Sequence, residues 1–264
     1  MEKFLQWLLA PIRITVLQPF YEKMYLFTIY AMNYGGGSFT DNSGEQYVVR
    51  YVARKTAQHS PGLITIFDVG ANVGSFTRLL LNELANRAII HCFEPSRATY
   101  QTLKANVREL NVQKHNIGLS HQIGELALYT DAEQSGMTSV YNRDLQHINV
   151  SFAQQEVASF STVDEFSANQ NIQQIDLLKM DVEGHELAVL KGASRMLKEQ
   201  RIQFIQFEFG GTNIDSRTYF RDFWHLLSPS YILYRIVGNG LYRIDAYSEF
   251  LEIFVTANFL AERK

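Results

Sequence analysis

Short apolar runs alternate with amphipathic segments along most of the chain after residue 62. Each apolar run predicts a strand buried on both faces of a sheet, and apolar residues at helical spacing predict the helices between them. The predicted strands lie at 63–69, 88–93, 112–118, 175–181 and 201–209, and the predicted helices at 75–86, 96–110 and 185–199. This order predicts an α/β fold with a doubly wound, mostly parallel sheet.

Further strands are predicted at two places outside this alternation. GELALYT (124–130) and EVASFSTVDEF (156–166) predict extra strands and a short helix, inserted before the strand at 175–181. The chain closes on three strand-like runs, YILYRIV, LYRID and FLEIFVTAN, with no helix between them. Consecutive strands joined by short connections pair antiparallel, so we expect antiparallel strands at one edge of the sheet.

Residues 1–60 are predicted to form a helical extension ahead of a core domain at 61–264. Charged residues and two prolines, Pro11 and Pro19, interrupt this apolar segment, and no apolar run approaches the roughly 18 residues of a membrane span. The extension is expected to cap the core, cover a substrate pocket or contact a second copy in a homo-oligomer. Peripheral membrane contact is the alternative, through an apolar face of Phe4, Trp7, Leu8 and Phe20.

Composition places the chain among ordinary globular proteins. It has 264 residues, of which 46% are hydrophobic and 19% charged, enough for one large α/β core. A net charge of -3 and a pI near 6.2 give no electrostatic reason to expect nucleic acid as a partner. Cys92 is the single cysteine, so no disulfide is possible within the chain, and a reducing, cytoplasmic location is expected.

The segment IFDVGANVG, residues 66–74, carries the clearest sign of a ligand. A predicted strand runs into a turn containing Gly70 and Gly74, where the backbone can approach a ligand closely, and a helix N-terminus follows. Glu94 ends the next predicted strand, about 20 residues later, where a carboxylate suits the hydroxyls of a ribose. The alternative is an ordinary strand-to-helix turn that binds nothing.

The residues of this turn indicate which nucleoside cofactor would fit. The dinucleotide pattern G-x-G-x-x-G is absent, because Asn72 and Ser75 replace its second and third glycines, and no P-loop is present. Asp68 would repel a phosphate but could help to hold an ammonium group. This combination favours S-adenosylmethionine, which has a zwitterionic amino-acid tail and no phosphate.

Acidic residues gather at the predicted carboxyl ends of the strands, where ligands bind in open α/β sheets. They are Asp68, Glu94, Asp181 and Glu208, and KMDVEGHE (179–186) adds further charged residues. Like charges repel, so such a cluster is hard to explain by stability alone. The alternative role is that of a first-turn acid in a helix, which fits Glu186 well, Glu183 less well and Asp181 poorly.

Three blocks of this sequence resemble the FkbM family of S-adenosylmethionine-dependent methyltransferases: FDVGANVGSFT, CFEPSRATYQTLKANV and IDLLKMDVEGHELAVLKGA. The resemblance covers about residues 63–210. It implies a class I methyltransferase (Rossmann-like) fold and O-methylation of sugar or polyketide hydroxyls. The chain has His185 where the family commonly has a small residue such as Ala; His185 is either an extra acid/base group or a surface helix residue, and the surface position is favoured.

The resemblance also implies which residues bind the cofactor. Asp68, Gly70, Ala71, Asn72 and Gly74 would line the methionine tail and the ribose, with Asp181 nearby. Glu94 would accept both ribose hydroxyls, and Pro95 and Ser96 would flank the adenine. Contacts to the adenine edge are expected from Asn116, Gly118 and Ser120.

Methyl transfer to an alcohol needs a general base or a metal-bound alkoxide, because an alcohol is a poor nucleophile at neutral pH. The candidate bases are Asp181 and Glu183, followed by His185. Glu208 could orient the substrate or share Mg²⁺ or Ca²⁺ with Asp181. Trp224 and Tyr219 could stack on a sugar.

The predicted function is O-methylation of a carbohydrate or glycolipid, so the expected partner is a glycan or a small-molecule acceptor. The alternatives are another small hydroxylated acceptor and a non-catalytic module of the same fold.

Overall fold

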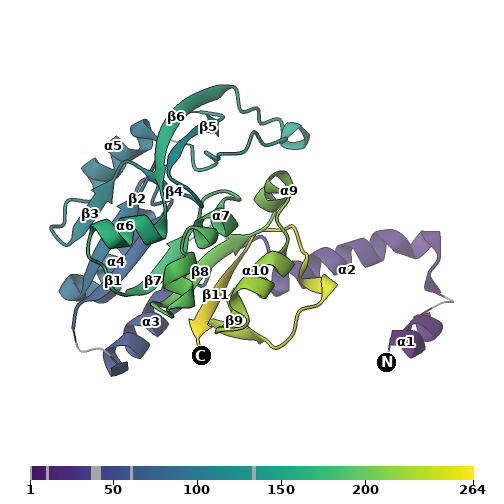
Figure 1. Cartoon of the computed structure of the whole chain (residues 1–264). Helices are drawn as coiled ribbons and strands as arrows, with labels where there is room; N and C mark the ends of the chain where they lie inside the picture. Colours follow the sequence, from purple (N-terminus) through teal and green to yellow (C-terminus); the bar gives the residue numbers. More distant parts are fainter. Residues whose placement is uncertain (1, 10–11, 37–42, 60–61, 133–134) are drawn as a thin grey trace.

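A computed structural model describes residues 2–9, 12–36, 43–59, 62–132 and 135–264. Its core is an eight-stranded sheet (Figure 1). From one edge to the other the strands are β3 (Val112–His115), β2 (Ala88–Phe93), β1 (Ile64–Val69), β7 (Ile175–Met180), β8 (Ile202–Phe209), β11 (Ala257–Arg263), β9 (Tyr231–Val237) and β10 (Gly240–Ile244). The first five are parallel, while β11 runs antiparallel to both β8 and β9, and β10 runs antiparallel to β9. The predicted doubly wound, mostly parallel sheet with antiparallel strands at one edge is confirmed.

Helices cover both faces of this sheet, and each face has its own hydrophobic cluster. One cluster packs under α3 (Glu45–His59), α4 (Ser75–Leu84) and α5 (Arg97–Asn106). The other packs under α6 (Val163–Asn169), α7 (Glu186–Lys191), α8 (Ser194–Lys198) and α10 (Phe220–Leu227). Two apolar clusters on opposite faces explain why the central strands read as continuous apolar runs. Cys92 is buried in the first cluster, as a small hydrophobic residue would be.

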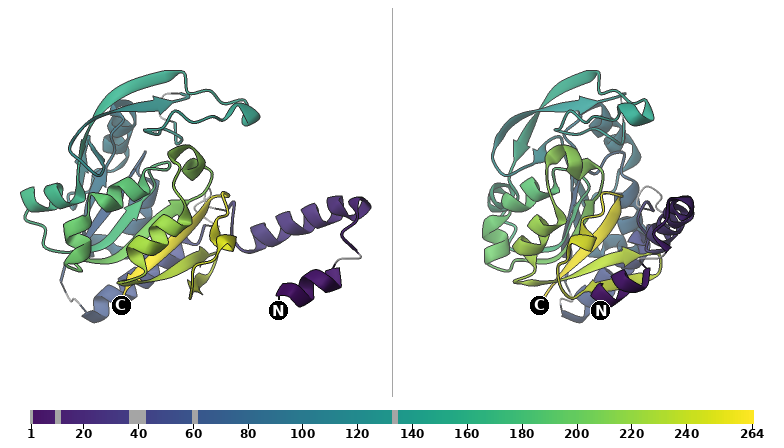
Figure 2. Two further views of the ribbon diagram at one scale, coloured as in Figure 1. Left: turned by 45° about the vertical axis from the view of Figure 1, so that its right-hand side comes forward. Right: turned by 90° about the vertical axis from the view of Figure 1, so that its right-hand side faces the viewer.

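Helices α1 (Glu2–Leu9) and α2 (Gln18–Ala31) project away from the sheet (Figure 2). Trp7 and Phe27 are both 74% exposed, and Phe4 and Phe20 are exposed as well. The side chain of Leu8, the remaining member of the predicted apolar face, lies outside the described residues. Among the described helices, none is both long enough and apolar enough to cross a membrane. Peripheral membrane contact, a homo-oligomer, a cytoplasmic location and a domain boundary near residue 61 all stay predictions.

The strand predicted at 112–118 is divided between two sheets, so this prediction is wrong in part. After β3 the chain leaves the main sheet, and β4 (Gly118–Leu119) pairs with β6 (Gln154–Ser161), which pairs in turn with β5 (Gly124–Thr130). The second sheet therefore contains the strands predicted as an insertion. It arches over one end of the main sheet (Figure 1).

The helix predicted at 185–199 is also interrupted, and it forms α7 and α8 instead. The break lies at Gly192, where an added Cβ would be 2.0 Å from the carbonyl oxygen of Ser120. Only glycine permits so close an approach between helix and neighbouring backbone. Helix α5 begins at Arg97, one residue later than predicted, and the side chain of Ser96 before it makes no capping hydrogen bond.

Candidate functional site

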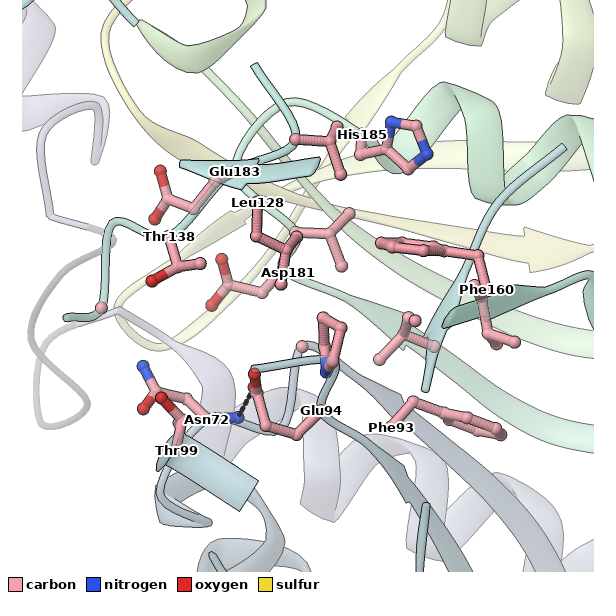
Figure 3. A pocket seen from close by; sticks show the side chains of 18 of the residues that line it. Asn72, Phe93, Glu94, Thr99, Leu128, Thr138, Phe160, Asp181, Glu183 and His185 are labelled. Carbon is pink, nitrogen blue, oxygen red and sulfur yellow. Dashed lines mark hydrogen bonds between the residues drawn. The ribbon is translucent and has the colours of Figure 1, made fainter. Parts of the chain in front are cut away.

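A cavity lies at the carboxyl ends of β1, β2 and β7, beneath the second sheet (Figure 3). Its wall combines apolar side chains with a few polar groups, as the walls of small-molecule sites usually do. Eight of the predicted site residues line it: Gly70, Asn72, Glu94, Pro95, Gly118, Asp181, Glu183 and His185. The position at the strand ends is the one expected for ligands of open α/β sheets.

The glycine turn after β1 brings the three strands together at the cavity. Gly70 has φ +75°, and a Cβ on it would lie 1.8 Å from the carbonyl oxygen of Asp181, so the turn packs directly on the backbone after β7. The amides of Gly70 and Ala71 both donate to the carbonyl oxygen of Phe93, at 3.0 and 3.1 Å. Asn72 follows with φ +49°. The close approach of the backbone at Asp181 and Phe93 therefore restricts which residues this turn can contain, in addition to any restriction that a ligand imposes.

Glu94 faces the cavity and also braces its two adjoining loops. One carboxylate oxygen accepts a hydrogen bond from the amide of Asn72 at 3.0 Å, and the other accepts one from the amide of Ser96 at 2.9 Å. The side-chain amide of Asn116 donates to the carbonyl oxygens of Glu94 and Pro95. Burial raises the pKa of Glu94 to about 7, although the two amide hydrogen bonds act in the opposite direction.

Glu94 should make the stability of the ligand-free protein depend on pH. Because its pKa rises from 4.5 to about 7 on folding, the folded state keeps a proton that the unfolded chain has already released. This stabilising contribution is fully present below pH 4.5 and is lost as the pH rises through about 7. We expect the free energy of unfolding of wild type, minus that of Glu94→Gln, to fall over this window in urea denaturation. A difference that stays constant with pH would show that Glu94 titrates alike in both states.

Asp68 lies beneath the cavity and does not line it. Its fully buried carboxylate accepts a hydrogen bond from the hydroxyl of Thr77 at 2.7 Å. The ammonium of Lys179 lies 3.5 Å from Asp68 and 3.4 Å from Asp181, whose carboxylate is 42% exposed. Burial acts to lower the pKa of Lys179, but Asp181, Asp68 and Glu45 together hold it above its usual value. Lys179 is therefore a buried cation that links Asp68 to the Asp181 carboxylate.

The turn between β7 and α7 is held by Glu186 and by two residues with left-handed backbone. Glu183 has φ +52° and Gly184 has φ +97°. One oxygen of the buried Glu186 carboxylate accepts hydrogen bonds from the amides of Val182 and Gly184, at 2.9 and 3.3 Å. The first-turn role predicted as the alternative for Glu186 is therefore the one that it fills.

Glu183, in the cavity wall, forms a buried ion pair with Arg143, a residue that no sequence pattern had indicated. The guanidinium of Arg143 lies 2.7 Å from the Glu183 carboxylate and 3.7 Å from that of Asp215. Burial raises the pKa of Glu183 to about 8; the negative charge of Asp181 adds to the increase, and Arg143 opposes it. A carboxylate with a pKa near the working pH is well matched to general-base catalysis.

The prediction that His185 is a surface residue is wrong. It is only 6% exposed, with Nε2 2.9 Å from the hydroxyl of Ser120 and Nδ1 3.2 Å from that of Tyr141. Burial lowers the pKa of His185 to about 4, so the imidazole is neutral at physiological pH. His185 is buried because two segments that are distant in the sequence, β4 and the segment that contains Tyr141, cover the start of α7.

Glu208 does not line the cavity. Phe207 pairs in register with Met180, so Glu208 is level with Asp181 on the neighbouring strand. Burial, together with Asp181 and Glu183, raises the pKa of Glu208 well above its usual value. No group of three or more potential metal-ligating side chains occurs among the described residues. Because Asp181 is already paired with Lys179, the donor set does not fit the predicted Mg²⁺ or Ca²⁺ site.

The remaining predicted residues do not line the cavity, and much of the actual lining was not predicted. Outside the lining are Asp68, Ala71, Gly74, Ser96, Asn116, Ser120, Glu208, Tyr219 and Trp224. The lining that the sequence did not indicate includes Phe93, Thr99, Leu119, Leu128, Ser135, Thr138, Val140 and Phe160. Several of these come from the second sheet and the connection after β5, whose position over the cavity no local pattern reveals.

Two polar side-chain atoms in the cavity wall have no hydrogen-bond partner within the described structure. They are the amide oxygen of Asn72 and the hydroxyl of Thr99, and both are buried. Buried polar atoms are almost always hydrogen-bonded, so a ligand with polar groups would fit here. Phe93, Leu119 and Phe160 supply apolar surface beside them.

The chain is similar to several known methyltransferases. The profile of the Methyltransferase FkbM domain matches residues 68–236. "Methyltransferase 1" of Beauveria bassiana is 30% identical over 143 residues, covering 48% of this chain and 57% of that protein. "Hexuronic acid methyltransferase AglP" of Haloferax volcanii is 24% identical over 172 residues, covering 64% of this chain and 65% of that protein. "2-O-methyltransferase NoeI" of Sinorhizobium fredii is 24% identical over 152 residues, covering 54% of this chain and 62% of that protein.

The chain thus spans about three fifths of the length of these relatives. Among solved structures, an O-methyltransferase from Bacillus cereus in complex with SAH is 14% identical, with a TM-score of 0.44, over 82% of this chain and 81% of that one. The profile match alone covers well over half of the chain and includes the glycine turn, Glu94 and the Asp181 turn. The chain belongs to the FkbM methyltransferase domain family.

Proposed function

We propose that this protein is an S-adenosylmethionine-dependent O-methyltransferase that acts on a hydroxyl of a sugar, polysaccharide or glycolipid. The observation that carries the proposal is the Glu94 carboxylate at the end of β2, facing a cavity beside a glycine turn without a phosphate-binding pattern. The hexuronic acid methyltransferase among the relatives supports a carbohydrate acceptor, and the 2-O-methyltransferase supports transfer to oxygen. Another small hydroxylated metabolite is the alternative acceptor.

The cavity residues suit each part of the cofactor. Glu94 would accept the ribose hydroxyls through lone pairs that its two amide hydrogen bonds leave free. The partnerless polar atoms of Asn72 and Thr99 would bind polar groups of the cofactor, and Phe93 and Phe160 would contact the adenine. When bound, S-adenosylmethionine supplies an electrophilic methyl group.

Two acidic residues, Glu183 and Asp181, act on the acceptor hydroxyl in this proposal. Glu183 takes the proton of the acceptor hydroxyl, because its raised pKa makes it a stronger base than an ordinary carboxylate. Asp181, held in place by Lys179, accepts a hydrogen bond from the acceptor and orients the attacking oxygen. The hydroxyl oxygen gains the methyl group as Glu183 gains the proton.

Calorimetry tests the cofactor assignment. We expect binding of S-adenosylmethionine and S-adenosylhomocysteine, but not of NAD or ATP. Glu94→Gln should weaken cofactor binding by about 1.5–3 kcal/mol, the range for a hydrogen bond to a charged group. Glu125→Gln is the matched control, because Glu125 is exposed in β5 and does not line the cavity. Micromolar NAD binding without S-adenosylmethionine binding, or unchanged affinity in Glu94→Gln, would refute the assignment.

The acceptor is best identified by mass spectrometry. The protein is incubated with S-adenosylmethionine and a panel of glycans, and the products are examined for a gain of one methyl group. We expect methylated glycans. A panel that stays unmodified, while a hydroxylated non-carbohydrate metabolite gains the methyl group, would establish the alternative acceptor class.

A further inference from the structure

A second cavity lies on the other side of His185, between α7, α9 (Thr212–Ser216) and α10. Its described lining residues are His121, Tyr141, His185, Leu187, Ala188, Lys191, Ser216, Arg217, Thr218, Asp222, His225 and Leu226. His185 lines both this cavity and the cofactor cavity, and Tyr141, 3.2 Å from the ring of His185, lines the second one. His185 is therefore part of the wall between the two cavities.

The lining of the second cavity carries unpaired positive charge. Within the described structure, the side chains of Lys191 and Arg217 make no ion pair or hydrogen bond. Asp222 is the one carboxylate among the described lining residues, and it is engaged by the amide of Tyr219 at the start of α10, at 2.9 Å. Lysine and arginine with no acidic partner in a concave site are suited to anionic oxygen groups.

A hydrogen-bonded turn with left-handed backbone holds Arg217 at the end of α9. Arg217 ends α9 with φ +54°, a left-handed conformation that long side chains seldom adopt and that glycine or asparagine usually fills at a helix end. The turn is fixed by the amide of Thr218, which donates to the carbonyl oxygen of Asn213 at 3.0 Å. This turn fixes where the Arg217 side chain leaves the backbone, at the edge of the second cavity.

We propose that this second cavity binds an anionic group of the methyl acceptor, a carboxylate or a phosphate, through Lys191 and Arg217, while the acceptor hydroxyl reaches the cofactor cavity past His185. This inference rests on the proposed function, because it names the class of acceptor. The side chains of Ser216 and Thr218, and the rings of His121 and His225, provide further hydrogen-bonding groups in the same lining. Acidic sugars and sugar phosphates both carry the required group.

Binding of three probes separates the possible acceptors. Methyl glucuronide, glucose 1-phosphate and methyl glucoside are titrated into protein saturated with S-adenosylhomocysteine, and binding is followed by NMR. We expect at least one anionic probe to bind about tenfold more tightly than methyl glucoside at low salt, with the preference decreasing as salt is added. Preference for the glucuronide would identify a carboxylate, and preference for the sugar phosphate a phosphate.

Variants then test whether the second cavity is responsible. The double variant Lys191→Gln with Arg217→Gln should lose the anionic preference but keep its affinity for S-adenosylhomocysteine. Arg54→Gln with Lys198→Gln is the control, since both residues are exposed, lie outside this lining and give the same change in charge. Equal binding of all three probes to the wild type, or a preserved preference in the Lys191 and Arg217 variant, would overturn the proposal. Failure to bind the cofactor would instead refute the proposed function.

Discussion

Glu183→Gln should lower turnover by about 10²–10⁴-fold and leave cofactor affinity nearly unchanged. The substitution keeps the shape of the side chain but removes its basicity, so the acceptor hydroxyl keeps its proton. Because burial raises the pKa of Glu183 to about 8, wild-type turnover should increase with pH and level off above that value. Steady-state kinetics across the pH range should show this increase for the wild type and not for the variant.

Asp181→Asn is the comparison for Glu183→Gln. If Asp181 orients the acceptor, its substitution should cost less than that of Glu183 and should preserve the rise of turnover with pH. A larger loss in Asp181→Asn, together with a flat pH profile, would instead identify Asp181 as the base. Chelator should leave wild-type turnover unchanged; loss of activity that Mg²⁺ or Ca²⁺ restores would show that these carboxylates hold a metal. Near-normal turnover in both variants would remove both residues from the mechanism.

Gly70→Ala should destabilise the protein by about 2–5 kcal/mol and abolish cofactor binding in whatever protein remains folded. A left-handed conformation costs a non-glycine residue about 1–2 kcal/mol, and overpacking adds about 1–3 kcal/mol. Both apply here, because Gly70 has φ +75° and its new Cβ would meet the carbonyl oxygen of Asp181 at 1.8 Å. Thermal and urea denaturation measure the loss of stability.

Gly238→Ala provides the control, since no atom lies within 4 Å of its added Cβ. We expect its stability to stay within about 0.5 kcal/mol of the wild type, as for most surface substitutions. If Gly70→Ala were as stable as Gly238→Ala, the turn after β1 would have to shift freely, and the close packing of β1 against the Asp181 turn would not be needed for folding.

The main sheet could be predicted from the sequence because its central strands are buried on both faces and therefore appear as continuous apolar runs. The helices between them appear as segments whose apolar residues recur at helical spacing. These patterns lie within single segments of the sequence, so they can be recognised without knowing how the segments pack together. The division of residues 112–118 between two sheets left no such signal. Likewise, the break between α7 and α8 depends on how closely Gly192 approaches Ser120, two residues that are far apart in the sequence.

The candidate site could be predicted where it is built from contiguous motifs. Gly70, Asn72, Glu94 and Asp181 lie in such motifs and do line the cavity. The cover of the site was not predictable, because it comes from an insertion whose placement is decided by tertiary packing. That cover buries His185, adds Leu128, Val140 and Phe160 to the apolar wall, and brings Arg143 to Glu183 across 40 residues of chain.

Under the mechanism proposed above, the ion pair between Arg143 and Glu183 would link proton transfer to the release of product. Arg143 belongs to the segment 135–153, which lies over the cavity and contributes to its wall. In that mechanism Glu183 becomes neutral when it takes up the acceptor's proton, and Asp215, 3.7 Å away, is then the anionic partner that Arg143 keeps among the described residues. On this mechanism the contact between the segment 135–153 and the turn after β7 is strongest before the methyl group moves and weakens with the proton transfer, so we expect opening of the cavity to follow catalysis.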